Sequence, residues 1–243
     1  MRTIRIYQKS DFQPGTELEL SEQAAHHVGT VLRLREGHAL QLFNGNNQQC
    51  TAVIRSIHKK QIIVSIESAE DYSCESPLDL HLGQALAKGE RMEWVIQKSV
   101  ELGVRGITPL LTEHCAVKLD TRRMEKKVAQ WQAIAISACE QCGRNYVPFI
   151  HPLTPFEKFI QEQPEHTQRL ILDPVASTKL SDLHLKPVPT SLIIGPEGGF
   201  SDQETSYAKT HGFRGLSLGR RILRTETAAI VSQSLLQGLL GDL

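Results

Sequence analysis

The 243-residue chain has no excess of charge of either sign, because 27 lysines and arginines balance 27 aspartates and glutamates. Net charge therefore gives no indication of a nucleic-acid partner, although a neutral total is compatible with a local basic patch. The sequence also lacks an apolar run of membrane-spanning length, so no membrane partner is expected. Its length and ordinary composition predict one or two globular domains with a substantial core.

The cysteine content also gives no indication of disulfide bonds. The chain has five cysteines, an odd number, and no pattern typical of a secretory signal. We therefore expect reduced thiols and a cytoplasmic protein. Cys139 and Cys142 form a C-x-x-C pair, but the segment around them has helical periodicity and no second pair follows. No metal site is predicted.

Residues 1–72 are predicted to be mainly β-structure, forming a small barrel or sandwich. Turn residues separate short segments in which apolar and polar residues alternate. One helix, with Ser21 as its candidate N-cap and Gly37 at its close, interrupts this pattern. The polar stretch 70–77 has no periodicity and is the predicted linker, which divides the chain into domains 1–72 and 73–243. The alternating segments are residues 2–7, 17–20, 38–43, 50–57 and 61–67.

After Pro77 the chain alternates between predicted strands and helices, which favours an α/β domain with a mostly parallel sheet. Two short strands, 170–172 and 192–194, are wholly apolar, as expected where both faces of a sheet are covered. A long helix is predicted over residues 121–142 with Thr121 as its N-cap, and the last helix is predicted to begin at an N-cap Thr225. The other predicted elements are strands in 78–87, 106–111 and 215–219 and a helix over 90–103.

A glycine-rich loop follows the strand in "SLIIGPEGGFSDQE", and a helix-like segment follows the loop. The loop is neither G-x-x-x-x-G-K-S/T nor G-x-G-x-x-G, and Glu197 would repel a phosphate. A tight turn with a solvated Glu197 is the simplest interpretation. A second glycine loop, "LGRRILRTETAA", and a third strand end at Asp173-Pro174 favour a ligand instead, because ligands bind beyond the carboxyl ends of parallel strands. Backbone N–H and C=O groups there would suit a neutral or cationic adenosine ligand.

The two C-terminal motifs, "LIIGPEGGFSDQE" and "LSLGRRILRTETA", resemble the SPOUT superfamily of methyltransferases. Together with "LGQALAKGERMEWVIQKSVELGV" and "ISACEQCGR", they resemble the 16S ribosomal RNA uridine-N3 methyltransferases (the RsmE family) over nearly the whole chain. This resemblance implies S-adenosyl-L-methionine held in a trefoil-knotted C-terminal domain, a PUA-like N-terminal domain that binds RNA, and a homodimer. It implies methylation of N3 of a specific uridine in 16S rRNA, within the assembled small ribosomal subunit. A related SPOUT enzyme acting on another RNA or base position, and a non-catalytic RNA-binding assembly factor, stay open as alternatives.

The resemblance also assigns the cofactor pocket, in which glycines let the backbone approach the ligand and three leucines enclose the adenine. At the third strand end this chain reads "LDPVA" where we associate "LHPRA" with the family, so Asp173 and Val175 stand where the resemblance implies a basic contact. The residues that match the family's pocket motif are Leu172, Ile194, Gly195, Glu197, Gly199, Leu218, Gly219, Leu223, Arg224 and Thr225.

Uridine N3 is a weakly acidic imide nitrogen, and it becomes nucleophilic when its proton leaves or when the developing anion is stabilised. Arg224 or Arg144 would supply that stabilising charge, and Glu140 is the nearest candidate base. A salt bridge at a helix end is an equally good interpretation of Glu140 and Arg144. The candidate RNA-binding residues are Arg5, His27, Arg33, Lys88, Arg220 and Arg221.

The C-terminal helix carries more apolar residues than one flank of a sheet needs. We therefore expect it, with the helix around residues 140–144, to form a symmetric dimer that completes the active site. The apolar residues concerned are Ile230, Val231, Leu235, Leu236, Leu239 and Leu240.

Overall fold

The computed structural model describes residues 4–59, 61–115 and 120–243. The chain forms two compact units, which we call the first and the second unit. The first consists of Met1–Glu75 together with Cys139–Val147, and the second of Ser76–Ala138 together with Pro148–Leu243. The chain therefore returns to its first unit after most of a long helix, a feature that no local pattern in the sequence indicated.

The first unit is built on a five-stranded sheet in the order β1-β3-β4-β5-β2. β1 pairs with β3 in parallel, and the other pairs are antiparallel. Alternate residues of the strands, such as Leu40, Ile54 and Val64, point into one apolar core. The predicted β-structure is confirmed, although residues 2 and 3 of the first predicted strand lie outside the described residues. The strands are β1 (Arg5–Tyr7), β2 (Glu17–Glu19), β3 (Ala39–Phe43), β4 (Gln48–His58) and β5 (Gln61–Asp71).

One short helix interrupts these strands, as predicted. The helix α1 (Glu22–His26) begins after Ser21, whose hydroxyl accepts a hydrogen bond from the backbone N–H of Ala24. A π-helical turn (His27–Val31) continues α1 directly, so the helical segment ends before the predicted Gly37. Gly37 lies instead in the turn that leads into β3, with a φ of +83° that glycine adopts without strain.

The second unit contains a parallel sheet in the order β12-β10-β11-β6-β7-β8, with β9 also paired to β7. Every strand pair in this sheet is parallel, which confirms the predicted sheet type. The path of the chain through a trefoil knot, which the resemblance implies, stays a prediction. The strands are β6 (Leu80–Ala85), β7 (Gly106–Leu111), β8 (Phe149–Ile150), β9 (Thr154–Pro155), β10 (Gln168–Leu172), β11 (Thr190–Ile194) and β12 (Arg214–Leu216).

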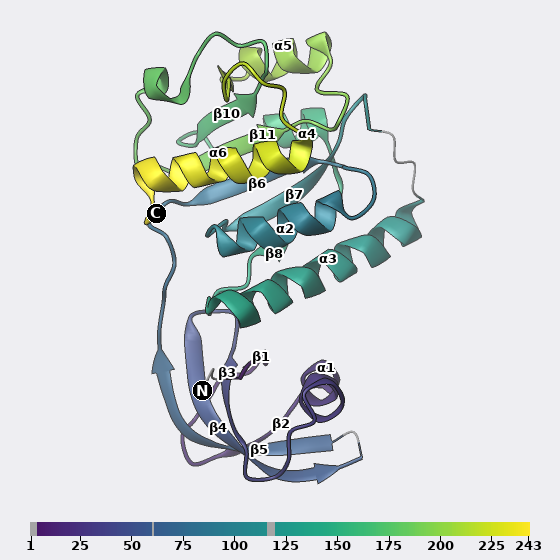
Figure 1. Cartoon of the computed structure of the whole chain (residues 1–243), viewed down its shortest axis with the longest axis vertical. Coiled ribbons are helices and arrows are strands. Elements are labelled where there is room, and N and C mark those ends of the chain that lie inside the picture. Colours follow the sequence, from purple (N-terminus) through teal and green to yellow (C-terminus); the bar gives the residue numbers. More distant parts are fainter. Residues whose placement is uncertain (1–3, 60, 116–119) are drawn as a thin grey trace. The chain divides into compact units, whose positions relative to one another are not determined.

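Helices cover this sheet on both faces, which explains why β11 is buried along its whole length. On one face α4 and α5 share a core with Ile171 and Ile193 of the central strands. On the other face α2 and α6 pack against each other, and Figure 1 shows them side by side in front of the sheet. The helices are α2 (Arg91–Glu101), α3 (Thr121–Cys142), α4 (Phe156–Gln161), α5 (Asp202–Thr210) and α6 (Thr225–Leu240), with a short 3-10 helix at Leu180–Leu183.

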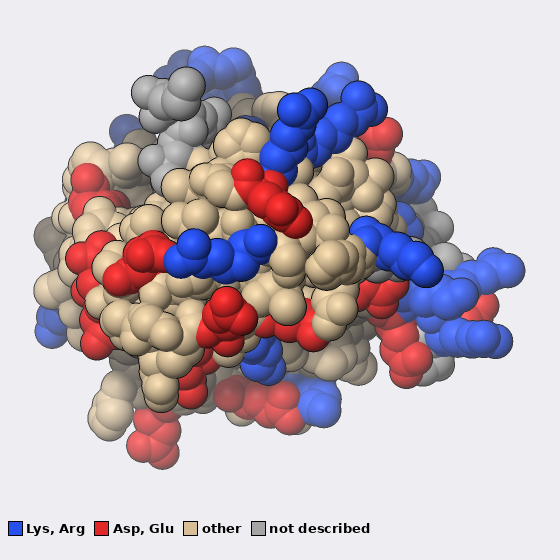
Figure 2. All heavy atoms as spheres, turned by 90° about the horizontal axis from the view of Figure 1, so that it is seen from below, with Lys and Arg blue, Asp and Glu red and all other residues tan. Residues whose placement is uncertain are grey.

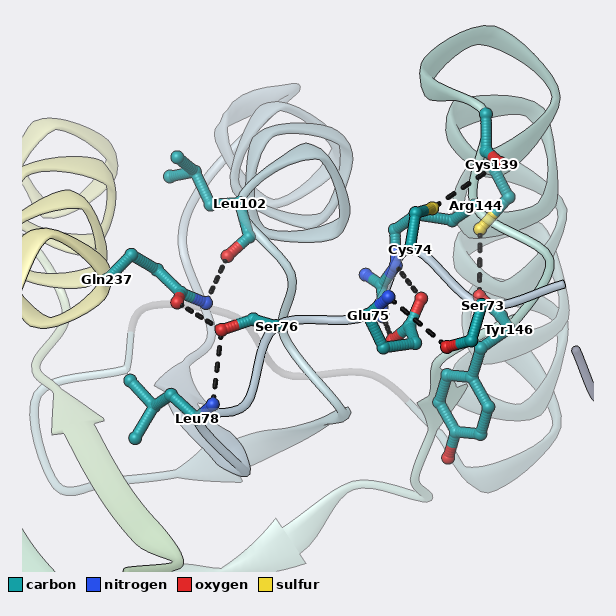
Figure 3. A network of polar contacts seen from close by, with 11 residues as sticks. Ser73, Cys74, Glu75, Ser76, Leu78, Leu102, Cys139, Arg144, Tyr146 and Gln237 are labelled. Atoms are coloured by element: carbon teal, nitrogen blue, oxygen red, sulfur yellow. Dashed lines mark hydrogen bonds and ion pairs between the residues drawn. The ribbon is translucent and has the colours of Figure 1, made fainter. Parts of the chain in front are cut away.

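Buried amides fix α6 against its neighbours, on a side that also buries Ala228, Ala229 and Leu236. Gln237 accepts a hydrogen bond from Ser76 Oγ at 2.6 Å and donates one to the carbonyl of Leu102 at 2.7 Å (Figure 3). One turn earlier, Gln233 donates to Ser99 Oγ at 2.8 Å. These hydrogen bonds are directional, so they restrict sliding and rotation of α6 on α2. The position of its N-terminal end, where the candidate site lies, follows from them.

Both predicted N-caps of the long helices are wrong by one residue. The helix α3 begins at Thr121, and the preceding Asp120 is its cap, since Asp120 Oδ1 accepts from the backbone N–H of Arg123 at 2.9 Å. The helix α6 begins at Thr225, and Arg224 is its N-cap residue, without a side-chain capping bond. Thr225 was a good cap candidate by type, but its hydroxyl is used in a tertiary contact. Within the described residues, no helix has the length and apolar character needed to cross a membrane.

Candidate functional site

A cavity of about 350 Å³ lies in the second unit, at the carboxyl ends of β10 and β11 and against the start of α6. This is the edge of a parallel sheet at which ligands bind. Seven of the nine predicted cofactor-binding residues line it, and so does Arg224, whereas Leu218 and Gly219 do not. The seven are Leu172, Ile194, Gly195, Glu197, Gly199, Leu223 and Thr225.

The loop from Gly195 to Gly199 forms one wall of the cavity, and a glycine stands at each of its ends. Gly199 has a φ of +72°, and its N–H donates to the carbonyl of Pro196 at 2.9 Å to close a tight turn. A Cβ at Gly195 would lie 3.3 Å from the backbone of Gly199 and Phe200. A side chain at either position therefore strains the turn or crowds it, and the loop keeps its backbone bare toward the cavity.

Thr225 links this wall to the rest of the site. Its buried hydroxyl donates to the carbonyl of Gly195 at 2.7 Å and accepts from Gln84 Nε2 at 2.9 Å. The glycine loop after β11, the end of β6 and the start of α6 are thus joined through one oxygen atom. This contact explains why Thr225 is the first residue of the helix and not its cap.

Charged side chains also line the cavity. Arg91, at the start of α2, forms an ion pair with Glu197, and Glu197 Oε1 also accepts from the backbone N–H of Lys88 at 3.1 Å. Partial burial would raise the pKa of Glu197, but the backbone N–H groups of Glu197 and Lys88 and the Arg91 guanidinium outweigh it and lower the pKa. The predicted solvated glutamate is therefore a structured, ionised part of the cavity wall.

Arg224 lies next to these groups on the rim. Its backbone has the extended conformation of an N-cap, with φ −64° and ψ 153°, and its side chain is exposed beside the cavity. The following residue is anchored by its hydroxyl, so the Cα of Arg224 has a well-defined position. A guanidinium at that place can reach a ligand in the cavity without leaving water completely.

The other two predicted catalytic residues lie in the first unit, at and after the end of α3. Arg144 Nε donates to Glu75 Oε1 at 2.8 Å, and the two side chains are only 5% and 3% exposed (Figure 3). Desolvation opposes the charge of Arg144, but the hydrogen bond and negative charge of Glu75 prevail and raise the pKa of Arg144. The predicted alternative of a salt bridge at a helix end therefore describes Arg144.

Glu140 is also engaged within the first unit. Its Oε1 accepts from the backbone N–H of Tyr7 at 3.0 Å, and its Oε2 lies 3.6 Å from His27 Nδ1. Burial raises the pKa of Glu140, and the Tyr7 N–H and the charges of His27 and Arg5 oppose that shift. Neither Glu140 nor Arg144 lines the cavity of the second unit.

The predicted RNA-binding residues have differing surroundings. Arg5 is committed to the first unit, since it donates to Asn145 Oδ1 at 2.6 Å and to Gln41 Oε1 at 2.7 Å. His27 is half-buried beside Glu140, whereas the side chains of the other four are exposed: Arg33, Lys88, Arg220 and Arg221. On the face shown in Figure 2, lysines and arginines are interspersed with acidic residues, and several basic side chains gather at the right edge of the view.

Sequence reasoning missed several residues of the cavity wall. Arg91 stands in the "KGERMEW" stretch that contributes to the family resemblance, but only the fold brings the start of α2 to the glycine loop. Glu226 follows Thr225 directly in the sequence, where nothing local gives it a role. Phe200 and Ile222 also contribute, the latter with 88% of its surface exposed.

Comparisons with known proteins identify this arrangement. Residues 74–237 match the model of the RNA methyltransferase domain, and residues 20–67 match that of the RNA methyltransferase PUA domain. The chain is 38% identical over 242 residues to the ribosomal RNA small subunit methyltransferase E of Buchnera aphidicola subsp. Schizaphis graminum, covering 100% of this chain and 98% of that protein. The chain belongs to the ribosomal RNA small subunit methyltransferase E family.

Solved structures agree with membership of the methyltransferase E family. The family member from Neisseria gonorrhoeae, bound to S-adenosyl methionine, is 36% identical, covers 99% of both chains and superposes with a TM-score of 0.92. A putative methyltransferase from Legionella pneumophila, in complex with the bound cofactor SAM, is 53% identical over 100% of both chains, with a TM-score of 0.97. The predicted fold class, a parallel α/β domain preceded by a PUA-like domain, is confirmed.

Proposed function

We propose that this chain is an S-adenosyl-L-methionine-dependent methyltransferase that methylates N3 of one uridine in 16S rRNA. It acts in the cytoplasm, as a homodimer, on the assembled small ribosomal subunit. The observation that carries the proposal is the cavity at the carboxyl edge of the sheet, walled by the Gly195–Gly199 loop and by residues 222–225, in a chain 53% identical to a protein solved with SAM. Residues 1–72 would bind RNA, and residues 73–243 would form the knotted catalytic domain.

The cavity wall fits an adenosine ligand. Leu172, Ile194 and Leu223 offer apolar surfaces for the adenine, and the bare backbone of the Gly195–Gly199 loop leaves amide and carbonyl groups for its edge. When bound, S-adenosyl-L-methionine supplies an electrophilic methyl group carried on a sulfonium. Thr225 holds the two walls in register through the carbonyl of Gly195, so the pocket is organised by the chain itself.

Within this proposal Arg224 is the catalytic residue. Loss of the N3 proton spreads negative charge over uracil O2 and O4, and a guanidinium on the rim stabilises that anion without transferring a proton itself. Arg144 is a poorer candidate than Arg224, because its charge is already matched by a buried carboxylate. Glu140 is a base candidate only if the first unit contributes to the reaction, through the RNA or through a second copy of the chain.

The test is direct detection of the product. Small subunits and naked 16S rRNA are prepared from a strain whose own copy of this gene is deleted, and each is incubated with the purified chain and S-adenosyl-L-methionine. Nucleoside mass spectrometry of the digested RNA should show N3-methyluridine, with more from the subunits than from the naked RNA. Another methylated nucleoside would favour a different SPOUT activity, and cofactor binding without any methylated nucleoside would favour an assembly factor.

A further inference from the structure

One carboxylate in the cavity wall lacks a hydrogen-bonding partner. Glu226 lies in the first turn of α6, and its side chain is only 15% exposed. Its Oε2 is buried, and no described residue donates a hydrogen bond to it. Arg91 Nε lies 3.9 Å from this oxygen, which is too far for a hydrogen bond.

Arg91 pairs with both acids of the wall but hydrogen-bonds only Glu197. Its Nη1 is bonded to Glu197 Oε1, and only the edge of the guanidinium approaches Glu226. Arg224 adds a second positive charge to the cavity rim, but among the described contacts it pairs with neither carboxylate. Glu226 Oε2 is therefore left as a buried acceptor without a hydrogen bond in the described residues, 3.9 Å from the edge of one guanidinium.

A buried carboxylate oxygen without a partner is costly, so such atoms are rare in folded proteins and tend to mark a functional role. Glu226 also lines the cavity, so a ligand cation bound there would lie beside this carboxylate and interact with its charge. If Arg224 meets the uracil, the methyl-bearing sulfur must lie beside that uracil, toward the end of α6 that carries both Arg224 and Glu226. The sulfonium of S-adenosyl-L-methionine is the cation that belongs there.

We propose that Glu226 recognises the sulfonium charge and thereby distinguishes the methyl donor from the demethylated product. This inference rests on the proposed function. S-adenosyl-L-homocysteine has the same adenosine, ammonium and carboxylate groups, but a neutral thioether takes the place of the sulfonium. A carboxylate that responds to that one difference favours binding of fresh donor over retention of spent product.

Isothermal titration of the Glu226→Gln variant tests the inference, because glutamine keeps the shape and removes the charge. The ligands are S-adenosyl-L-methionine, S-adenosyl-L-homocysteine and sinefungin, in which a protonated amine replaces the methylated sulfonium. Affinity for the first and third should fall about 10- to 100-fold, the range for a lost charge-assisted contact. Affinity for S-adenosyl-L-homocysteine should stay within error of the wild type.

Asp202→Asn is the matched control, because it removes an exposed acid from the first turn of α5 that does not line this cavity. It should leave all three affinities unchanged. Equal losses for all three ligands in Glu226→Gln would mean that Glu226 binds the ribose or the ammonium, and no loss would mean that it binds nothing; both results overturn the inference. Failure of the wild-type chain to bind any of the three would instead overturn the proposed function.

Discussion

Arg224 and Thr225 are neighbours in the chain with opposite surroundings. Thr225 is buried and bonded on both sides, whereas Arg224 is exposed at the rim of the cavity. The anchored threonine therefore fixes the backbone position of the arginine, and the arginine places a positive charge at the rim of the cavity. Substitution of Thr225 and substitution of Arg224 should therefore have different effects.

We expect Arg224→Ala to lower the single-turnover rate of methylation by about 100- to 1000-fold, the usual effect of losing one preorganised electrostatic contact. RNA affinity should fall less. Arg224→Lys should restore part of the rate, because a point charge does not reproduce the planar guanidinium. Arg221→Ala, three residues earlier and outside the cavity lining, is the control and should affect RNA binding at most. A normal rate with weakened RNA binding in Arg224→Ala would make Arg224 a phosphate contact.

The sequence predicted which residues line this site better than it predicted the contacts between them. The glycine loops could be recognised because bare backbone at the end of a parallel strand is typical of a ligand site. The N-cap at Thr225 was wrong because a threonine hydroxyl serves equally well as a cap and as a tertiary anchor, and only the position of Gly195 decides between them. Arg91 and Glu226 were missed because their importance depends on contacts between α2, α6 and the loop, which no local pattern contains.

Gly199 provides a second test at the scale of single residues. A valine there has room for its Cβ, since no protein atom lies within 4 Å, but Gly199 lines the cavity and its φ of +72° is unfavourable for a branched residue. Gly199→Val should therefore weaken S-adenosyl-L-methionine binding, measured by calorimetry, in a protein that still folds. Gly212→Val has a similar φ of +84° outside the cavity, and should lose stability without losing affinity.

At the scale of elements, α3 is the unusual one, because its last residues and the segment after them belong to the first unit. The buried pair of Arg144 and Glu75 fastens this segment to the residues just before the second unit begins. The sequence suggested a salt bridge for Arg144 but gave no partner. Glu75 is 69 residues away, and pairs at such separations leave no periodic signal.

We expect Arg144→Ala to lower the free energy of unfolding by about 3–5 kcal/mol, because it leaves the carboxylate of Glu75 buried without its partner. The exposed pair of Arg55 and Glu67, with side chains 55% and 48% accessible, is the matched control. Arg55→Ala should cost less than about 1 kcal/mol. Urea denaturation measures both. A stable Arg144→Ala protein that binds cofactor but does not methylate RNA would restore Arg144 as a catalytic residue.

At the scale of the whole molecule, the outer side of α6 retains apolar surface. Leu236 is buried, but Leu235 and Leu239, one turn apart, are 43% and 59% exposed. The predicted excess of apolar residues on this helix is therefore partly unused by the single chain. Its use in a homodimer stays a prediction.

We expect the chain to sediment as a dimer, and Leu235→Lys combined with Leu239→Lys to shift it to the monomer, because a dimer interface tolerates buried lysines poorly. Leu111→Lys, at a residue of β7 that is 44% exposed, is the control and should sediment as the wild type does. Analytical ultracentrifugation at micromolar concentration gives the answer. A wild-type protein that is monomeric under these conditions would contradict the prediction.

The return of residues 139–147 to the first unit also determines when that unit can be completed during synthesis. Arg5 and Gln49 hydrogen-bond Asn145, and Tyr7 hydrogen-bonds Glu140, so the β-sheet lacks these partners until they have been translated. An emerging chain usually finishes its N-terminal domain first. Here the ribosome must make Ser76–Ala138 of the second unit before the first unit can close, so completion of the first unit depends on synthesis of part of the second.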